Sequence, residues 1–202
     1  MKKTIICIGR EFGAGGRKVA AILKEKTLLP VYDKELLSEA AAQCGFGSYL
    51  FKKRDEKRHL FSFSRLFSSS SWNADNYMGD NELFQMQSET IRHIAQKEGS
   101  CIIIGRCADY VLRDEEGLVS VFLCCPMEER VKRVCARMDV DEKTAREIIA
   151  RKDRNRRSYY NGYTLGKWGD AATYDLCIDT SVLGDEGTAD LILDFIRRLE
   201  TE

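Results

Sequence analysis

The fold is decided by residues 4–27, TIICIGREFGAGGRKVAAILKEKT. Thr4–Ile8 is a short β-branched run, typical of a strand that is buried on both faces. Glycines 13, 15 and 16 come next, and from Val19 the apolar residues repeat with helical spacing to about Thr27. Backbone N–H groups in such a loop can hold a phosphate, because glycine lets the main chain approach the anion closely. The alternative is a structural glycine turn.

The loop matches the strict phosphate-loop pattern G-x-x-x-x-G-K-[ST] only in part. With Gly15 at the second glycine, Arg10 stands at the first, Gly16 at the lysine and Arg17 at the Ser/Thr. Both the lysine that reaches the β- and γ-phosphates and the hydroxyl that holds Mg²⁺ are therefore replaced. Arg17, Lys18 or Arg10 could supply the missing positive charge, unless Arg17 and Lys18 are only solvated residues of an exposed turn. The expected phosphate-binding residues are Gly13, Ala14, Gly15, Gly16, Arg17 and Lys18.

Strand-like and helical patterns alternate along the rest of the chain. Further strands are expected over 29–32, 101–104, 119–124 and 174–179. Helices are expected over 34–44, 82–98, 126–138, 141–149 and 188–199, the last with Leu191, Ile192, Phe195, Ile196 and Leu199 facing the core. This alternation predicts an α/β fold of three layers, with a five-stranded parallel sheet covered by helices on both faces. The length of 202 residues predicts one domain, 1–202.

Composition argues against several classes of protein. Lys and Arg number 32, as do Asp and Glu, so the formal net charge of zero removes the global electrostatic case for nucleic-acid binding. His59 and His93 lie far apart and no CxxC spacing occurs, which argues against a zinc site. No apolar run reaches the roughly 18 residues of a membrane span, and the start lacks a secretory signal, so we expect a cytoplasmic protein.

Charged residues follow two of the expected strands, at the sheet edge where open α/β sheets bind ligands. Asp33 follows 29–32, where it could serve a ligand or cap the next helix. Arg106 follows 101–104, and its guanidinium could form two parallel hydrogen bonds with an acceptor phosphate or only a surface salt bridge. Asp109 would share its helical face and could orient Arg106 or contact a base.

Seven basic residues lie between Lys143 and Arg157, a block that usually stays solvated. Aromatic residues follow it directly, at Tyr159 and Tyr160. A single-stranded RNA binder that stacks bases on such rings is a third interpretation, which the zero net charge disfavours.

Several segments together resemble the nucleoside monophosphate kinases, and most closely the cytidylate kinase-like family. The loop motif GREFGxGG followed by GRxAD is fairly specific to that group. The matching segments cover nearly the whole chain in the expected order. They are IGREFGAGGRKVA (8–20), VYDKELL (31–37), IIIGRCADYVL (102–112), VFLCCPMEERVKR (121–133), DRNRRSYY (153–160) and YDLCIDTS (174–181).

The resemblance implies a P-loop kinase fold with an acceptor-binding helical insertion over 34–98 and a mobile lid over 141–170. It implies transfer of the γ-phosphoryl group of ATP, with Mg²⁺, to a cytidylate-like nucleoside monophosphate or a related small phosphorylated acceptor. A catalytically impaired nucleotide-binding protein with a degenerate loop is the alternative. The resemblance places Asp33, Arg106 and Asp109 at the acceptor and Arg154, Arg156 and Arg157 in the lid. Glu11 and Asp33 are the candidate metal ligands.

Overall fold

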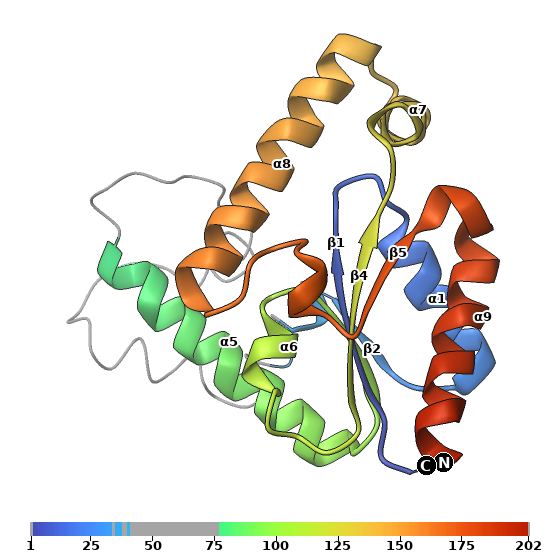
Figure 1. Cartoon of the computed structure of the whole chain (residues 1–202). Helices are drawn as coiled ribbons and strands as arrows, with labels where there is room; N and C mark the ends of the chain where they lie inside the picture. Colours follow the sequence, from blue (N-terminus) through green and yellow to red (C-terminus); the bar gives the residue numbers. More distant parts are fainter. Residues whose placement is uncertain (1, 34, 38–39, 41–76, 202) are drawn as a thin grey trace.

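A parallel five-stranded sheet forms the centre of the computed structural model, which describes residues 2–33, 35–37, 40 and 77–201 (Figure 1). The strand order is β2-β3-β1-β4-β5, and every neighbouring pair is parallel. The expected α/β class is therefore confirmed. The strands are β1 (Ile5–Arg10), β2 (Val31–Tyr32), β3 (Cys101–Ile104), β4 (Leu118–Cys124) and β5 (Leu176–Asp179).

Alternate side chains of the central strands build two separate cores, one on each face of the sheet. Ile6 and Ile8 belong to one buried cluster, whereas Ile5 and Cys7 belong to the other. This follows from the period of two along a strand, and it explains why β1 reads as an uninterrupted apolar run. The first face is covered by α1 (Gly16–Thr27) and α9 (Thr180–Thr201), and the second by α5 (Tyr77–Glu98) and α6 (Ala108–Val111), as Figure 1 shows.

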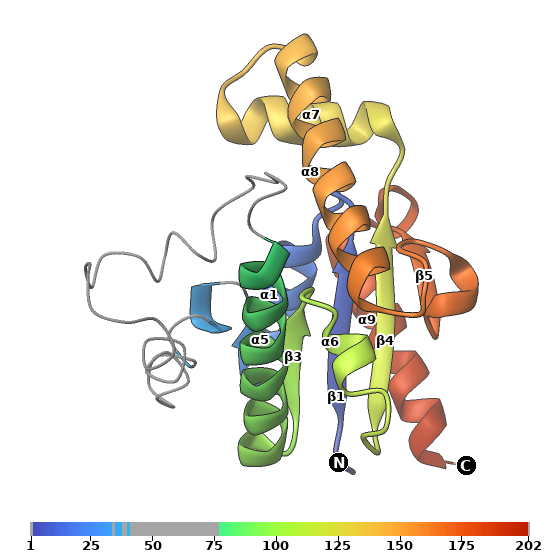
Figure 2. The same cartoon turned by 90° about the vertical axis from the view of Figure 1, so that its left-hand side faces the viewer.

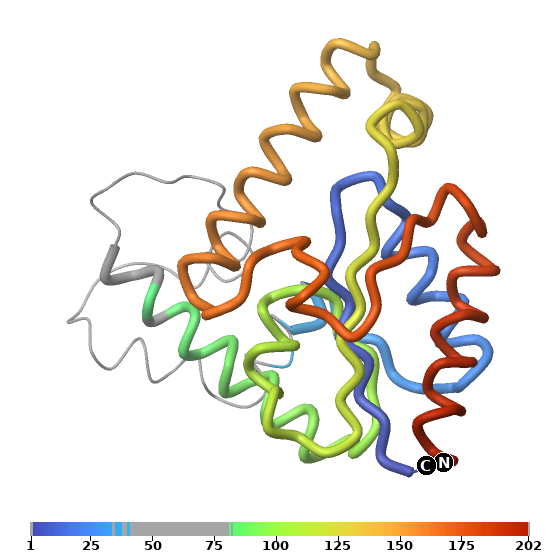
Figure 3. The backbone as a smooth tube through the Cα atoms, in the orientation of Figure 1, coloured from blue at the N-terminus to red at the C-terminus, as the bar shows by residue number. Residues whose placement is uncertain are grey.

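α7 (Met127–Met138) lies beyond the carboxyl ends of the strands, and α8 (Glu142–Tyr163) begins there and runs back beside the sheet toward α6 (Figure 2). Asp141 caps α8, since its side chain accepts a hydrogen bond from the Thr144 N–H group at 2.6 Å. The 3₁₀ helix η2 (Ala171–Thr173) then leads the chain back to β5. The tube in Figure 3 shows that both termini lie together at the opposite end of the sheet from α7 and α8.

Some boundaries differ from the sequence prediction. β1 continues to Arg10 because it pairs with β4 as far as Leu123. α5 begins at Tyr77 rather than 82, and the expected closing helix over 188–199 is the second part of α9, which is kinked at Gly184. Leu191 and Leu199 do not face the core, because the buried stripe of α9 runs through positions 189, 192 and 196. The helix over 34–44 and the insertion over 34–98 lie largely outside the described residues.

In the described part of the chain, no helix combines the length and the apolar character that crossing a membrane requires.

Candidate phosphate-binding site

The glycine-rich loop connects β1 to α1 at the carboxyl edge of the sheet. Gly13 and Gly15 have positive φ angles of 91° and 85°, which favour glycine. Space requires glycine as well, since a Cβ on Gly15 would lie 2.5 Å from Asp185 Oδ1. Thr180 fixes the loop by donating its hydroxyl to the Ala14 carbonyl at 3.0 Å. No side chain caps the start of α1 and no acidic residue lies in its first turn, so this helix end is suited to an anion.

Glu11 and Phe12 are held by the α7–α8 side of the molecule. Glu11 Oε2 accepts a hydrogen bond from the Cys125 N–H group at 3.0 Å and lies 3.6 Å from Arg130 Nε. The Phe12 N–H group donates to Asp153 Oδ1 at 2.7 Å, and Asp153 Oδ2 is paired with Arg130 Nη1 at 2.5 Å. The first half of the loop is therefore anchored to both helices. Sequence reasoning missed Arg130 and Asp153, which no local pattern connects to the loop.

Arg10 and Arg156 meet at the end of β1. Arg156 Nη1 donates a hydrogen bond to the Arg10 carbonyl at 3.0 Å. Burial is the main cause that lowers the pKa of both guanidinium groups, that of Arg156 to about 10, and neighbouring arginines, among them Arg106 and Arg17, lower it further. Cationic side chains from β1, the β3–α6 connection, α1 and α8 are thus gathered at one place.

Arg106 lies in a strained segment at the end of β3. Gly105, Arg106 and Cys107 have successive φ angles of 73°, 62° and 55°. A left-handed conformation costs a non-glycine residue roughly 1–2 kcal/mol, and such strain gathers at functional sites. The Arg106 guanidinium carbon lies 5.9 Å from the centre of the Tyr159 ring on α8. The structure therefore places Arg106 at the ligand edge, as the sequence predicts.

Asp33 caps the segment that follows it and also pairs with Arg17, while its role at a ligand stays a prediction. Its Oδ1 accepts hydrogen bonds from the backbone N–H groups of Glu35 and Leu36 at 3.1 and 3.3 Å, as a helix cap does. Its Oδ2 lies 3.1 Å from Arg17 Nη2, which is also 2.7 Å from Glu35 Oε2. The charge of Arg17 is therefore balanced by two carboxylates. Lys18 is largely exposed and lies 3.8 Å from Asp185.

Asp109 lies close to Arg106 in the sequence but has a different hydrogen-bond partner. Tyr160 Oη donates to Asp109 Oδ2 at 2.5 Å. Burial raises the pKa of the Asp109 carboxyl, and the hydrogen bond from Tyr160 opposes that rise. The Asp109 carboxylate therefore holds α8, and a role of Asp109 in orienting Arg106 or contacting a base stays a prediction.

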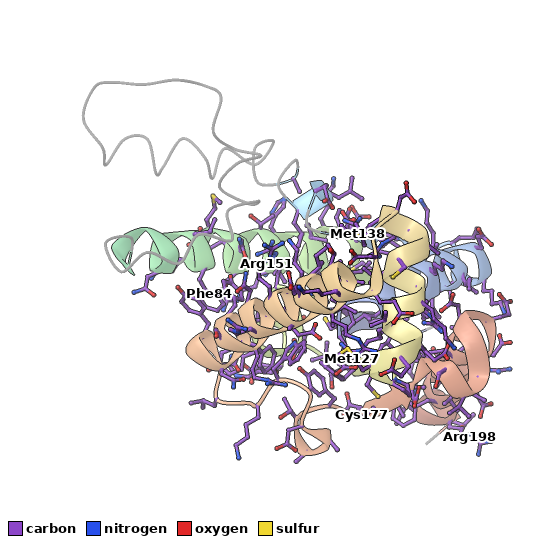
Figure 4. All side chains as sticks on the ribbon, turned by 90° about the horizontal axis from the view of Figure 1, so that it is seen from above. Phe84, Met127, Met138, Arg151, Cys177 and Arg198 are labelled. Carbon is purple, nitrogen blue, oxygen red and sulfur yellow. The ribbon has the colours of Figure 1, made fainter. Side chains whose placement is uncertain are left out.

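Of the three expected lid arginines, only Arg156 reaches the loop. Arg154 and Arg157 are exposed, and the Arg157 guanidinium lies over the Trp168 ring at 5.3 Å. Seen from above, Phe84 of α5 lies beside the C-terminal end of α8 (Figure 4). There Phe84 stacks on Tyr163, with ring centres 4.4 Å apart. Motion of the lid over 141–170 stays a prediction.

The two candidate metal ligands are Glu11 and Asp33. The described residues contain no group of three or more His, Cys, Asp or Glu side chains that could hold a metal ion. Mg²⁺ bound with a nucleotide keeps several waters and needs only one or two carboxylates. Both candidates are already engaged by other groups: Asp33 by two backbone N–H groups and Arg17, and Glu11 by Arg130 and a backbone N–H group, so the metal ligands stay a prediction.

Comparison with known proteins identifies the family. The model of the cytidylate kinase-like family matches residues 5–182. The chain belongs to the cytidylate kinase-like family. This confirms the resemblance that its sequence segments carry.

Two curated relatives are cytidylate kinases of archaea. That of Pyrococcus horikoshii is 30% identical over 122 residues, which cover 60% of this chain and 59% of the relative, so less than two thirds of that protein is matched. That of Methanocaldococcus jannaschii is 25% identical over 201 residues, which cover 97% of this chain and 99% of the relative.

Solved structures agree with this placement. A protein from Eubacterium ventriosum matches with a TM-score of 0.70 and 33% identity, over 96% of this chain and 98% of that one. Shikimate kinase from Acinetobacter baumannii matches with a TM-score of 0.50 and 13% identity, over 100% and 97% of the two chains, a likeness of fold alone. Family and fold therefore agree, and the structural neighbours show the same fold as a known kinase.

Proposed function

We propose that this chain transfers the γ-phosphoryl group of ATP to a nucleoside monophosphate, cytidylate-like, or to a related small phosphorylated acceptor. The observation that carries the proposal is the gathering of Arg10, Arg106 and Arg156 beside the uncapped start of α1. The nearby carboxylate of Asp33 is already paired with Arg17. An excess of buried positive charge is stabilised by a polyanion, and phosphoryl transfer needs such charge more than it needs covalent chemistry.

The residues divide between the two substrates by their place along the sheet edge. The backbone of Gly13–Gly16 lies at the start of α1, where it suits the triphosphate of the donor. Arg106 follows β3, the neighbour of β1, where its guanidinium suits the phosphate of the acceptor. Arg156 lies between them, held through the Arg10 carbonyl. When bound, Mg²⁺ would neutralise charge on the β- and γ-phosphates, and Glu11 and Asp33 are the candidates to hold it or its waters.

ADP release, measured with ATP and Mg²⁺ across CMP, UMP, AMP, GMP and their deoxy forms, tests the proposal. We expect turnover with at least one monophosphate. Arg106→Gln should lower kcat/KM for that acceptor by about 10²-fold, because one charged donor to a phosphate is lost, while ATP affinity stays near the wild-type value. A matched control is Arg198→Gln at the far end of α9, which removes the same charge from an exposed pair. Absence of turnover with every acceptor in a folded protein would contradict the proposal.

The replaced lysine and Ser/Thr of the loop favour a second function, nucleotide binding without catalysis. Calorimetry with Mg-ATP separates the two. Tight binding of ATP together with no ADP release on any monophosphate is the outcome expected for the non-catalytic protein.

A further inference from the structure

Position 16 is lysine in the strict loop pattern and glycine here, and the side chain of Arg10 occupies the space beside it. A Cβ on Gly16 would lie 3.0 Å from Arg10 Cγ and 3.3 Å from Arg10 Cβ. A lysine side chain built from position 16 would therefore start against the methylene groups of Arg10. The loop has room for one long cationic side chain at this place, and residue 10 supplies it.

The guanidinium end of the Arg10 side chain lies against Gly105. A Cβ on Gly105 would lie 1.8 Å from Arg10 Nη1 and 2.9 Å from Arg10 Cζ. β1 and β3 are neighbours, so this guanidinium lies between the phosphate loop at the end of β1 and Arg106 after the end of β3. The lack of side chains at Gly16 and Gly105 thus leaves the space that the Arg10 side chain fills between β1 and β3.

The charge of Arg10 is also unusual in its surroundings. Within the described residues, its guanidinium forms neither an ion pair nor a hydrogen bond, whereas Arg17 pairs with two carboxylates and Lys18 lies beside Asp185. Burial and the adjacent arginines lower the pKa of Arg10, and the Asp33 carboxylate, which forms no ion pair with it, opposes that shift only in part. A desolvated cation without a carboxylate is stabilised when an anionic ligand supplies the missing charge.

We infer that Arg10 takes the place of the absent loop lysine, binding the β- and γ-phosphate oxygens of the donor through a guanidinium that lies beside Gly105, on a side chain whose methylene groups lie beside Gly16. The inference rests on the proposed function, in which the donor is ATP. In the reaction, an oxygen of the acceptor phosphate forms a bond to the γ-phosphorus. The bond from that phosphorus to the β–γ bridging oxygen breaks, and its electron pair leaves on ADP. Arg10 stays protonated and neutralises charge on the transferring group throughout.

A charge swap tests the inference directly. Calorimetry with Mg-ATP, Mg-ADP and inorganic triphosphate, together with ADP release, is applied to Arg10→Gln, Arg10→Lys, Gly16→Lys and the double variant Arg10→Gly with Gly16→Lys. Arg198→Gln is the control for loss of a surface charge. Arg10→Gln should weaken ATP and triphosphate binding about 10- to 100-fold, and lower turnover about 10²- to 10³-fold, as loss of one preorganised donor does. Arg10→Lys should recover part of both losses.

The decisive comparison is between the ATP affinities of Gly16→Lys and of the double variant, which should differ from the sum of the effects of the two single changes. Gly16→Lys alone should weaken binding, because its side chain meets Arg10, whereas the double variant should return ATP affinity to within about tenfold of the wild type. Should Arg10→Gln fail to fold, Arg10→Lys and the swap still decide: a double variant that binds no better than Gly16→Lys alone overturns the inference. So does Arg10→Gln binding ATP as the wild type does.

The outcomes also separate the inference from the function on which it rests. Arg10-dependent binding of ATP without turnover on any acceptor removes the kinase function and keeps the phosphate-binding role of Arg10. Turnover that Arg10→Gln leaves at the wild-type level keeps the function and removes the role of Arg10.

Discussion

Substitution of Asp153 should destabilise the protein more than its position on a helix at the edge of the molecule suggests. Its carboxylate accepts hydrogen bonds from the Phe12 N–H group at 2.7 Å and from Arg130 Nη1 at 2.5 Å. Both charged side chains are shielded from water, with 14% of Asp153 and 8% of Arg130 exposed. Removing the carboxylate leaves a buried guanidinium with only Glu11, at 3.6 Å, to balance it.

The size of the effect follows from that burial. Breaking a buried ion pair by removing one partner costs about 3–5 kcal/mol, so we expect Asp153→Ala to lower the free energy of unfolding by about that amount. For a domain of this length, a loss of that size lowers Tm by about 6–20 °C. Asp153→Asn should lose about 1 kcal/mol less, because its amide oxygen can still accept the hydrogen bond from the Phe12 N–H group.

Urea unfolding, followed by circular dichroism and extrapolated linearly to water, measures these free energies. Glu128→Gln is the matched control: Glu128 and Arg146 are also 2.5 Å apart, but both are exposed, so the free energy should stay unchanged within error. Asp153→Leu combined with Arg130→Met should recover most of the loss, since an apolar pair can replace a buried ion pair. A loss in Asp153→Ala no larger than that in Glu128→Gln would refute the reasoning.

Two further substitutions test the site. Tyr160→Phe removes the hydrogen bond that opposes the raised pKa of the Asp109 carboxyl, so that pKa rises further, and the loss of stability should be larger at neutral pH than near the ordinary pKa of aspartate, about 4. Urea unfolding at both pH values checks this, and an equal loss at the two contradicts it. Gly15→Ala combines a left-handed φ with a Cβ 2.5 Å from Asp185 Oδ1, so we expect a loss of about 1–3 kcal/mol and weaker ATP binding in calorimetry. Gly99→Ala is its control, with a φ of 70° and open space around the added carbon, and an equal loss in the two variants would show that the contact has no effect.

The sheet could be predicted from the sequence because its signals are local. Each strand is a short, mostly apolar run, and the glycines after Ile8 mark the loop within a few residues. Asp33 shows the limit of such reasoning: the sequence indicated a cap or a ligand contact, and the structure shows the cap together with an ion pair to Arg17. That ion pair could not be predicted, because Asp33 and Arg17 are brought together only by the fold.

The contacts that complete the site could not be predicted because they join distant segments. The Phe12 N–H group meets Asp153 across 141 residues of chain, and no periodicity connects the two. The space for the Arg10 guanidinium depends on Gly105, which belongs to a different strand-end. The sequence did present Arg10 as one of three sources of charge, but choosing among them required the carboxylates that the fold places beside Arg17.

Because Arg106 has a left-handed backbone conformation, a substitution that raises thermal stability at this position is expected to lower the rate of phosphoryl transfer. Glycine adopts that conformation without steric penalty, so Arg106→Gly relieves backbone strain of roughly 1–2 kcal/mol while it deletes the guanidinium proposed to hold the acceptor. A library sorted only for survival at high temperature would therefore enrich inactive proteins at this codon, and such a selection has to score phosphoryl transfer at the same time.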